Sequence, residues 1–295
     1  MKIALAGLGN MGFPMAERLL AKPFSLTLTN RTREKALPLL EKGAIWASTP
    51  AEAAREAKVF ATILSDDAAL DSLLNGAGVF DALPKGSVHL SLSTISVDFA
   101  KRLEWEHDRR GQGFVAAPVF GRPDAVTEGR LRILCAGKPD SVNLVMPVLD
   151  TLGSRIFPLG DSPPVANLVK LSGNFMIASA LEALGESFAL VRSAGVDPAL
   201  FLEILNDSLF RSPLYENYGK MMAEKRYDKA GFTMDLGLKD LRLILEAAEG
   251  LRVPLPLASI ARDSLLAGLA RGRQPLDWSA MVLSHYERAG LDENH

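Results

Sequence analysis

Short apolar runs alternate with helical patterns through the first half of the chain. The runs at residues 1–6, 25–29, 59–64, 88–90, 114–117, 132–136 and 155–157 predict strands, and the segments 13–20, 34–42, 51–57, 97–109 and 140–152 have the period of helices. Such alternation is typical of a mostly parallel sheet with helices on both faces. We therefore predict an α/β domain with a doubly wound parallel sheet over residues 1–162.

The pattern changes after the segment Gly160-Asp161-Ser162-Pro163-Pro164. A single long helical pattern covers residues 165–194, and its two leading prolines suit the first turn of a helix, while Gly195 suits its end. Further helical patterns lie at 198–207, 214–224, 234–250, 256–271 and 277–289. We therefore predict an all-α domain over residues 163–295, joined to the first domain by the long helix.

A glycine motif follows the first predicted strand. Gly7-Leu8-Gly9-Asn10-Met11-Gly12 has the spacing G-x-G-x-x-G and leads directly into a predicted helix. Gly7 allows a sharp turn, Gly9 lets a pyrophosphate approach the backbone, and Gly12 lets the helix pack close to the strand. A turn that binds nothing is the alternative, but the complete strand–turn–helix context favours dinucleotide binding and a Rossmann-type domain.

The end of the second predicted strand indicates which dinucleotide binds. NAD-binding sites normally carry an acidic residue at this place, where it binds the ribose 2′-hydroxyl. Here the residues are Asn30, Arg31 and Thr32. A guanidinium attracts a 2′-phosphate that a carboxylate would repel. We therefore predict NADP(H) in preference to NAD(H); the alternative is that Arg31 stacks on the adenine or points to solvent.

Composition narrows the classes of function. The chain has 295 residues, 48% hydrophobic and 23% charged, with a net charge of −2, and no block of one charge predicts binding to nucleic acid or membrane. Glu182 and Glu186 interrupt the longest apolar stretch, so no membrane span is expected. The single Cys135 and the lack of a signal-peptide pattern indicate a reducing, cytoplasmic compartment. No histidine has a partner at metal-ligand spacing, so no metal site is expected.

A proton donor is needed wherever a hydride reaches a carbonyl, because the oxygen becomes an alkoxide. Lys170 is the candidate, in the segment Lys170-Leu171-Ser172-Gly173-Asn174 near the start of the long helix. Asn174 lies one turn later on the same helical face, where its amide can hold the substrate or the lysine. By itself, a lysine on a helix is most often a solvated surface residue.

Taken together, these motifs resemble the β-hydroxyacid dehydrogenase family, which includes 3-hydroxyisobutyrate dehydrogenase and the glyoxylate/succinic semialdehyde reductases. The resemblance covers essentially the whole chain, and it implies hydride transfer between a nicotinamide and a small β-hydroxyacid or semialdehyde. It implies Lys170 as proton donor or acceptor, and a homodimer or homotetramer. The segments similar to the family's motifs are Gly7 to Gly12, Asn30-Arg31-Thr32, the dinucleotide loops Leu64-Ser65-Asp66 and Ser93-Thr94, Lys170 with Asn174, and Lys239-Asp240-Leu241, whose lysine is implied to lie near nicotinamide and substrate.

The substrate loop departs from that family. The usual sequence Asp-Ala-Pro-Val-Ser-Gly-Gly is here Ala116-Ala117-Pro118-Val119-Phe120-Gly121-Arg122. Phe120 replaces a serine whose hydroxyl helps to hold a substrate carboxylate in the family, and Arg122 replaces a glycine. An inward Arg122 would bind an acid bidentately. An outward one would leave a more apolar pocket, suited to an uncharged aldehyde, ketone or imine; Phe120 packing in the core is the plainer interpretation.

Two other functions compete with hydroxyacid chemistry. Imine reductases share this architecture, but an Asp or Tyr commonly stands where this chain has Lys170, whereas Phe120 mildly favours that reaction. A cofactor-binding scaffold without catalysis is the third hypothesis, and relatives of that type have lost the lysine. The leading prediction is thus an NADP(H)-dependent reductase or dehydrogenase of a small molecule, with Asn174, Lys239, Asp240 and the loop from Val119 to Arg122 (Val119, Phe120, Gly121, Arg122) binding the substrate.

Overall fold

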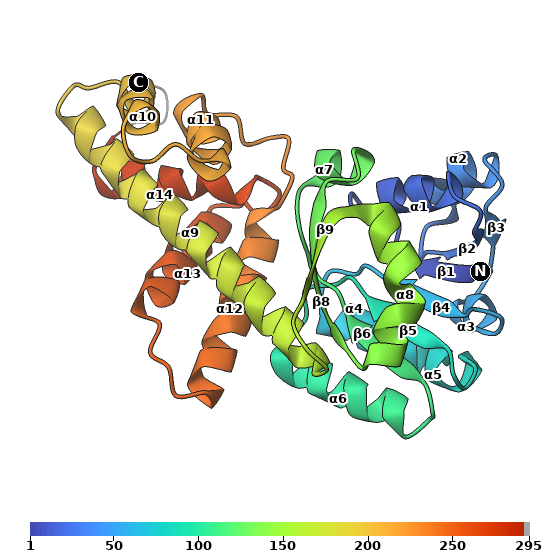
Figure 1. The fold of residues 1–295 in the computed structure, drawn as a ribbon. Helices are drawn as coiled ribbons and strands as arrows, with labels where there is room; N and C mark the ends of the chain where they lie inside the picture. Colours follow the sequence, from blue (N-terminus) through green and yellow to red (C-terminus); the bar gives the residue numbers. More distant parts are fainter. Residues whose placement is uncertain (292–295) are drawn as a thin grey trace. The chain divides into compact units, whose positions relative to one another are not determined.

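The computed structural model describes residues 1–291, which divide into two compact units (Figure 1). The first unit is Met1–Lys170 and the second runs from Leu171 onward. The first contains the sheet with its covering helices, and the second is built from helices.

The sheet of the first unit has the strand order β3-β2-β1-β4-β5-β6-β8-β7, with β9 paired to β8. All neighbours from β3 to β6 are parallel, whereas β8 runs antiparallel to β6 and β7. The chain leaves β1 towards β2 and β3 and returns to β4 on the other side of β1, so the switch point of the sheet lies between β1 and β4. The bounds are β1 (Lys2–Ala6), β2 (Ser25–Thr29), β3 (Ile45–Trp46), β4 (Val59–Thr62), β5 (Val88–Ser91), β6 (Gly113–Ala116), β7 (Val119–Phe120), β8 (Leu131–Gly137) and β9 (Gly153–Pro158).

Both faces of this sheet are buried, which explains why the strands are continuous apolar runs. Along β1, Ile3 and Leu5 belong to one core cluster and Ala4 and Ala6 to the other, as the two-residue period of a strand requires. Helices α1 (Gly12–Leu20) and α8 (Pro139–Leu152) cover the first face, and α3 (Pro50–Ala54), α5 (Val79–Ala82) and α6 (Val97–Asp108) cover the second. The predicted α/β class is confirmed.

Several elements of the first unit differ from the sequence prediction. The helix expected at 34–42 is a 3₁₀ turn, η1 (Arg33–Ala36), followed by the short α2 (Leu37–Leu40), which has a proline in its first turn. Sequence reasoning missed the π-helical η2 (Ser72–Gly76), which follows α4 (Asp67–Asp71), and it also missed α5, α7 (Pro123–Thr127) and the strand β7. All of these are too short to produce a periodic pattern.

The second unit is helical as predicted, and the described residues from Leu171 to Leu291 form no strand, only an isolated bridge between Thr233 and Asp277. The segment expected at 277–289 begins as a 3₁₀ turn, whose N-cap Asp277 accepts the backbone N–H of Ser279. The segment expected at 214–224 begins with the π-helical η3. The bounds are α9 (Pro163–Ser193, which starts in the first unit), α10 (Pro198–Asp207), η3 (Tyr215–Gly219), α11 (Lys220–Ala223), α12 (Met234–Gly250), α13 (Pro256–Leu269), η4 (Trp278–Met281) and α14 (Val282–Arg288).

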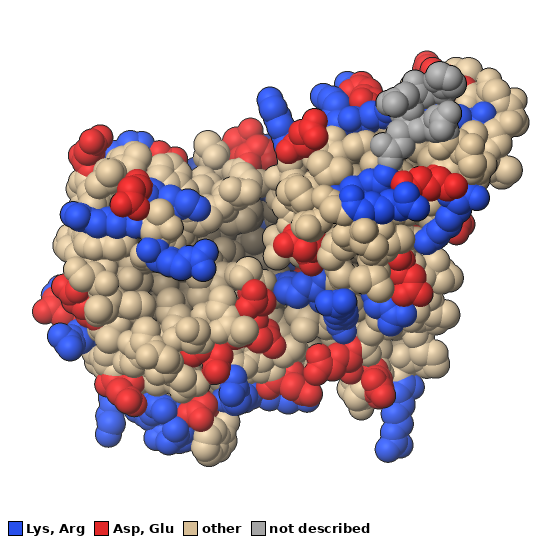
Figure 2. Space-filling model, turned by 180° about the vertical axis from the view of Figure 1, so that it is seen from behind, with Lys and Arg blue, Asp and Glu red and all other residues tan. Residues whose placement is uncertain are grey.

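Helix α9 is, among the described residues, the one helix with the length and apolar composition to span a bilayer. These two criteria are weak evidence, since a buried core helix meets them as well, and α9 carries fully buried residues such as Leu181 and Phe188. On the face of the molecule in Figure 2, acidic and basic side chains are interspersed without an extended patch of one sign.

Candidate active site

The glycine turn lies between β1 and α1, at the switch point of the sheet. Gly7 has φ +103°, and a Cβ there would lie 2.2 Å from the carbonyl oxygen of Ile63. A Cβ on Gly12 would lie 1.9 Å from the Gly7 carbonyl oxygen. Gly9, in contrast, has no atom within 4 Å of its ideal Cβ position, so its backbone faces open space. Two glycines are therefore required by packing, and the middle one leaves room for a ligand.

Asn30 fixes this turn to the end of β2. Its Oδ1 accepts the backbone N–H of Leu8 at 3.0 Å, and its Nδ2 donates to the carbonyl oxygen of Thr32 at 2.9 Å. Arg31 and Thr32 are exposed beside it. The Asn30 side chain is thus used to hold the backbone, and Arg31 is the residue of this segment that can offer charge to a ligand.

A groove of about 440 Å³ runs along the turn. Two charged residues, Glu34 and Lys35, lie in its wall, and no sequence motif marks them as ligand-binding. The groove combines the open face of Gly9, the start of α1 and the Lys35 ammonium, which suits the phosphates of a dinucleotide. Its lining residues are Leu8, Gly9, Asn10, Phe13, Pro14, Glu34, Lys35 and Pro38.

The loops that follow β4 and β5 are tied to one another at the same edge of the sheet. The backbone N–H of Leu64 donates to Ser93 Oγ at 2.9 Å, and that of Ser96 donates to Asp67 at 2.9 Å. Asp66 caps α4 by accepting the backbone N–H of Ala69 at 2.8 Å. Hence Leu64, Ser65, Asp66 and Thr94, the residues assigned by resemblance to the dinucleotide, belong to two coupled loops at the carboxyl ends of parallel strands.

Lys170 is a buried residue of α9, only 9% exposed. Its Nζ lies 4.1 Å from the centre of the Phe120 ring, a cation–π contact. Phe120 is half-buried in β7, and Gly121 after it has φ +144°, where a Cβ would meet Leu131 at 2.6 Å. Val119 is buried and Arg122 half-buried at the N-cap of α7. The altered substrate loop therefore places its aromatic ring against the candidate proton donor.

Asn174, Lys239 and Asp240 come together in the second unit. Asn174 Nδ2 donates to Asp240 Oδ2, and Lys239 Nζ lies 2.9 Å from Asp240 Oδ1 in an ion pair. Asp240 is only 2% exposed. A carboxylate so buried holds the side chains of Asn174 and Lys239 together at this place.

Sequence reasoning missed Asn167, which lies on α9 one turn before Lys170. It is fully buried, and its Oδ1 accepts the backbone N–H of Ile95 at 3.3 Å, next to the loop of Thr94. Its Nδ2 has no hydrogen-bond partner among residues 1–291. The three-residue spacing from Lys170 on one helix was the available signal.

Comparison with known proteins identifies the family of the chain. The model of the NAD binding domain of 6-phosphogluconate dehydrogenase matches residues 2–160, and that of the NAD-binding domain of NADP-dependent 3-hydroxyisobutyrate dehydrogenase matches residues 165–284. An uncharacterized oxidoreductase, YfjR, of Bacillus subtilis (strain 168) is 44% identical over 96% of this chain and 99% of its own length. Glyoxylate/succinic semialdehyde reductase 1 of Arabidopsis thaliana is 30% identical over 96% and 97%.

A solved structure shows the same fold. The 3-hydroxyisobutyrate dehydrogenase of Salmonella typhimurium superposes with a TM-score of 0.87 at 24% identity, covering 96% of this chain and 99% of that one. The resemblance predicted from the motifs is confirmed by both family models. The chain therefore belongs to the β-hydroxyacid dehydrogenase family and is an NAD(P)-dependent oxidoreductase that acts on a CH–OH group.

Proposed function

We propose that this protein is an NADP(H)-dependent oxidoreductase of a small β-hydroxyacid or its semialdehyde, with Lys170 as the proton donor and acceptor. The nicotinamide, when bound, supplies or accepts the hydride at the carbonyl carbon. The observation that carries the proposal is the burial of the Lys170 side chain against the Phe120 ring. A lysine that served only solubility would stand in water, as most lysines on helices do.

Lys170 has the chemistry that the oxygen of the substrate requires. Its ammonium donates a proton to the oxygen as negative charge develops there, and in the oxidative direction the neutral amine takes the proton back. The ring of Phe120 limits the positions of the ammonium and shields one side of it from water. Asn174, one turn further along α9, has its amide oriented by Asp240 and offers hydrogen bonds to the substrate.

The preference for NADP(H) rests on charge at the end of β2. Asn30 leaves no carboxylate there, Arg31 is exposed, and Lys35 lines the adjoining groove. Two positive groups near the place of the ribose 2′-oxygen favour a phosphate over a hydroxyl. The 2′-phosphate would gain charge-assisted hydrogen bonds that NAD(H) cannot form.

Phe120 supports a second candidate function on the same scaffold. An aromatic ring stands where the family has a serine, so the loop has lost one hydroxyl that can bind a carboxylate. Arg122 is half-buried close by and offers a guanidinium in its place. If Arg122 does not take that role, uncharged carbonyls or imines become the better substrates.

The experiment that tests both is NADPH oxidation against glyoxylate, succinic semialdehyde, methylmalonate semialdehyde, an uncharged aldehyde and a cyclic imine. We expect turnover on the acids, and turnover confined to the uncharged compounds would replace the first function by the second. Lys170→Ala is expected to lower kcat by about 10²–10⁴-fold while NADPH affinity is kept. Lys22→Ala, at an exposed lysine of the same unit, is the matched control. A Lys170→Ala variant with the kcat of the control would refute the role of Lys170.

A further inference from the structure

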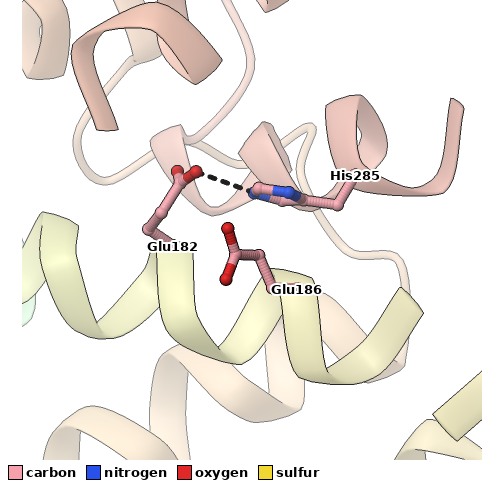
Figure 3. A group of neighbouring side chains, drawn as sticks. All are labelled: Glu182, Glu186 and His285. Carbon is pink, nitrogen blue, oxygen red and sulfur yellow. Dashed lines mark ion pairs between the residues drawn. The ribbon is translucent and has the colours of Figure 1, made fainter. Parts of the chain in front are cut away.

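Three potential metal ligands meet in the second unit, away from the residues discussed so far (Figure 3). Glu182 and Glu186 lie one turn apart on the same face of α9, and His285 reaches them from α14. One ligand atom from each side chain lies within 4.8 Å of the other two. The 3.6-residue helical period brings the two carboxylates together, but no sequence spacing links them to a histidine almost a hundred residues later, which is why the sequence predicted no metal site.

The cluster contains buried polar atoms without hydrogen bonds. Glu182 and His285 are each only 5% exposed, and both Glu182 Oε2 and His285 Nε2 have no hydrogen-bond partner among residues 1–291. A buried polar atom left unpaired destabilises the folded state, and more so when it is charged. In Figure 3 the dashed line runs from Glu182 Oε1 to His285 Nε2, and the carboxylate of Glu186 lies on the same side of the imidazole, so the unpaired Nε2 is directed into the cluster.

The surrounding residues hold these side chains in place. Ser264 Oγ donates to Glu182 Oε1 at 2.8 Å, which leaves Oε2 as the free oxygen of that carboxylate. Gly185 lies beneath the imidazole, where a Cβ would meet His285 Cδ2 at 2.6 Å and Nε2 at 3.2 Å. The guanidinium of Arg288 binds Ser264 Oγ at 3.3 Å, so it reaches the hydroxyl rather than a carboxylate. Neighbouring residues that orient a carboxylate and hold an imidazole in place are typical of the surroundings of a metal site.

We propose that Glu182, Glu186 and His285 bind one divalent transition-metal ion. One imidazole nitrogen and two carboxylates suit Zn²⁺ and its neighbours in the first row, whereas Mg²⁺ and Ca²⁺ prefer oxygen alone. Glu186 is exposed, so the remaining coordination position faces water. The ion would link α9 to α14. Its site lies about 18 Å along α9 from Lys170 at the usual helical rise, so we assign it a structural role.

An ion pair within the cluster is the competing interpretation. His285 Nε2 lies 3.4 Å from Glu182 Oε1, and a protonated imidazole would satisfy part of the buried charge. That ion pair involves Glu182 Oε1 and does not need Glu186, whereas the proposed metal site needs Glu186 as a ligand. The contribution of Glu186 therefore decides between the two.

The experiment measures Zn²⁺ binding by chelator competition on tag-free, metal-stripped full-length protein, with Co²⁺ absorption as a second signal. We expect one Zn²⁺ per chain, and an affinity lowered at least about ten-fold in Glu186→Gln and in His285→Gln. Glu186 is exposed, so its variant tests the site even if His285→Gln fails to fold. Gly185→Ala keeps every ligand but displaces the ring, and we expect it to weaken binding as well.

Glu203→Gln, at an exposed glutamate of α10, is the matched control and should bind Zn²⁺ like the unaltered protein. Two results would overturn the proposal. One is that the unaltered protein takes up no Zn²⁺ more tightly than Glu186→Gln does. The other is that Glu186→Gln and Glu203→Gln weaken binding equally, which would mean general attraction of a cation to acidic residues.

Discussion

A chain of buried hydrogen bonds under the sheet makes the stability of the first unit depend on pH. Gln112 Nε2 donates to the carbonyl oxygens of Phe80 and Leu83, so its Oε1 faces His107 Nδ1 at 2.8 Å. His107 Nδ1 must therefore carry the proton, which leaves Nε2 to accept from His89 Nδ1 at 2.9 Å. His89 Nε2 in turn accepts the Thr62 hydroxyl at 2.9 Å. Both imidazoles are neutral in this arrangement.

Protonation of either ring would break the chain of hydrogen bonds inside the core. Burial lowers the pKa of His107 from 6.5 to about 4, and burial together with the neighbouring His107 lowers the pKa of His89 well below 6.5. The unfolded chain binds these protons near pH 6.5, so stability is complete above that pH and falls as the pH drops towards the folded-state pKa. At pH 5 the unfolded histidine is almost fully protonated, which makes the loss about 2 kcal/mol for His107 alone.

The assay is urea unfolding between pH 7.5 and pH 5, followed by hydrogen exchange of amides in the first unit. We expect a loss of at least about 2 kcal/mol over this range, the share of His107, and a further loss from His89. In His107→Phe the ring can pack between Phe80 and Phe114, but the partners of the imidazole are left unpaired. That variant should be less stable at pH 7.5 and lose about 2 kcal/mol less on acidification.

Direct titration gives the result that would refute this reasoning. The chain has four histidines, so its imidazole Cε1–H signals can be followed individually by NMR. The signals of His89 and His107, assigned by substitution, should move only slightly between pH 8 and pH 5, without a midpoint in that range. If both titrate near pH 6.5, the two rings are not held neutral and the linkage argument fails.

Three further predictions concern the proposed site. Gly12→Ala should weaken NADPH binding about ten-fold or more in a fluorescence titration, because its Cβ would overlap the Gly7 carbonyl oxygen; unchanged affinity would show that α1 shifts without cost. Arg31→Ala should lower the ratio of kcat/KM for NADPH to that for NADH by about ten-fold, and an unaltered ratio would assign the 2′-phosphate to other groups. Phe120→Ser restores the serine of the family and should raise kcat/KM for acidic substrates over an uncharged aldehyde by about ten-fold, unless Arg122 already provides the carboxylate site.

The sequence predicted the features that depend on local chemistry. The glycine turn, the strands of the parallel sheet and the long helix all follow from patterns within one segment, and they appear in the structure where they were expected. The bounds of α12, Met234–Gly250, are those of the predicted helix, because the amphipathic pattern of a long helix shows where it begins and ends. Short elements such as β7 were missed, since two residues have no period.

Contacts between distant segments were not predictable in the same way. The ring of Phe120 was expected either to pack in the core or to reshape a pocket, and the structure places it against the Lys170 ammonium. Asp240 was assigned to substrate by resemblance, and the structure shows it buried, hydrogen-bonded to Asn174 and ion-paired with Lys239, contacts that no sequence spacing predicted. Which side chains meet depends on tertiary packing, and a single sequence does not encode that in any fixed spacing.

Helix α9 contains residues of both proposed sites, and their distance along the helix allows the two sites to be tested separately. Lys170 lies in its first turns and the pair Glu182 and Glu186 about 18 Å further along, too far for direct interaction between the ammonium and a metal ion in water. Loss of the ion in Glu186→Gln should thus lower thermal stability and leave kcat unchanged. Lys170→Ala should lower kcat and leave the ion bound. If Glu186→Gln reduced kcat as strongly as Lys170→Ala, the metal would have to be placed in the reaction, and the structural role we assign to it would be wrong.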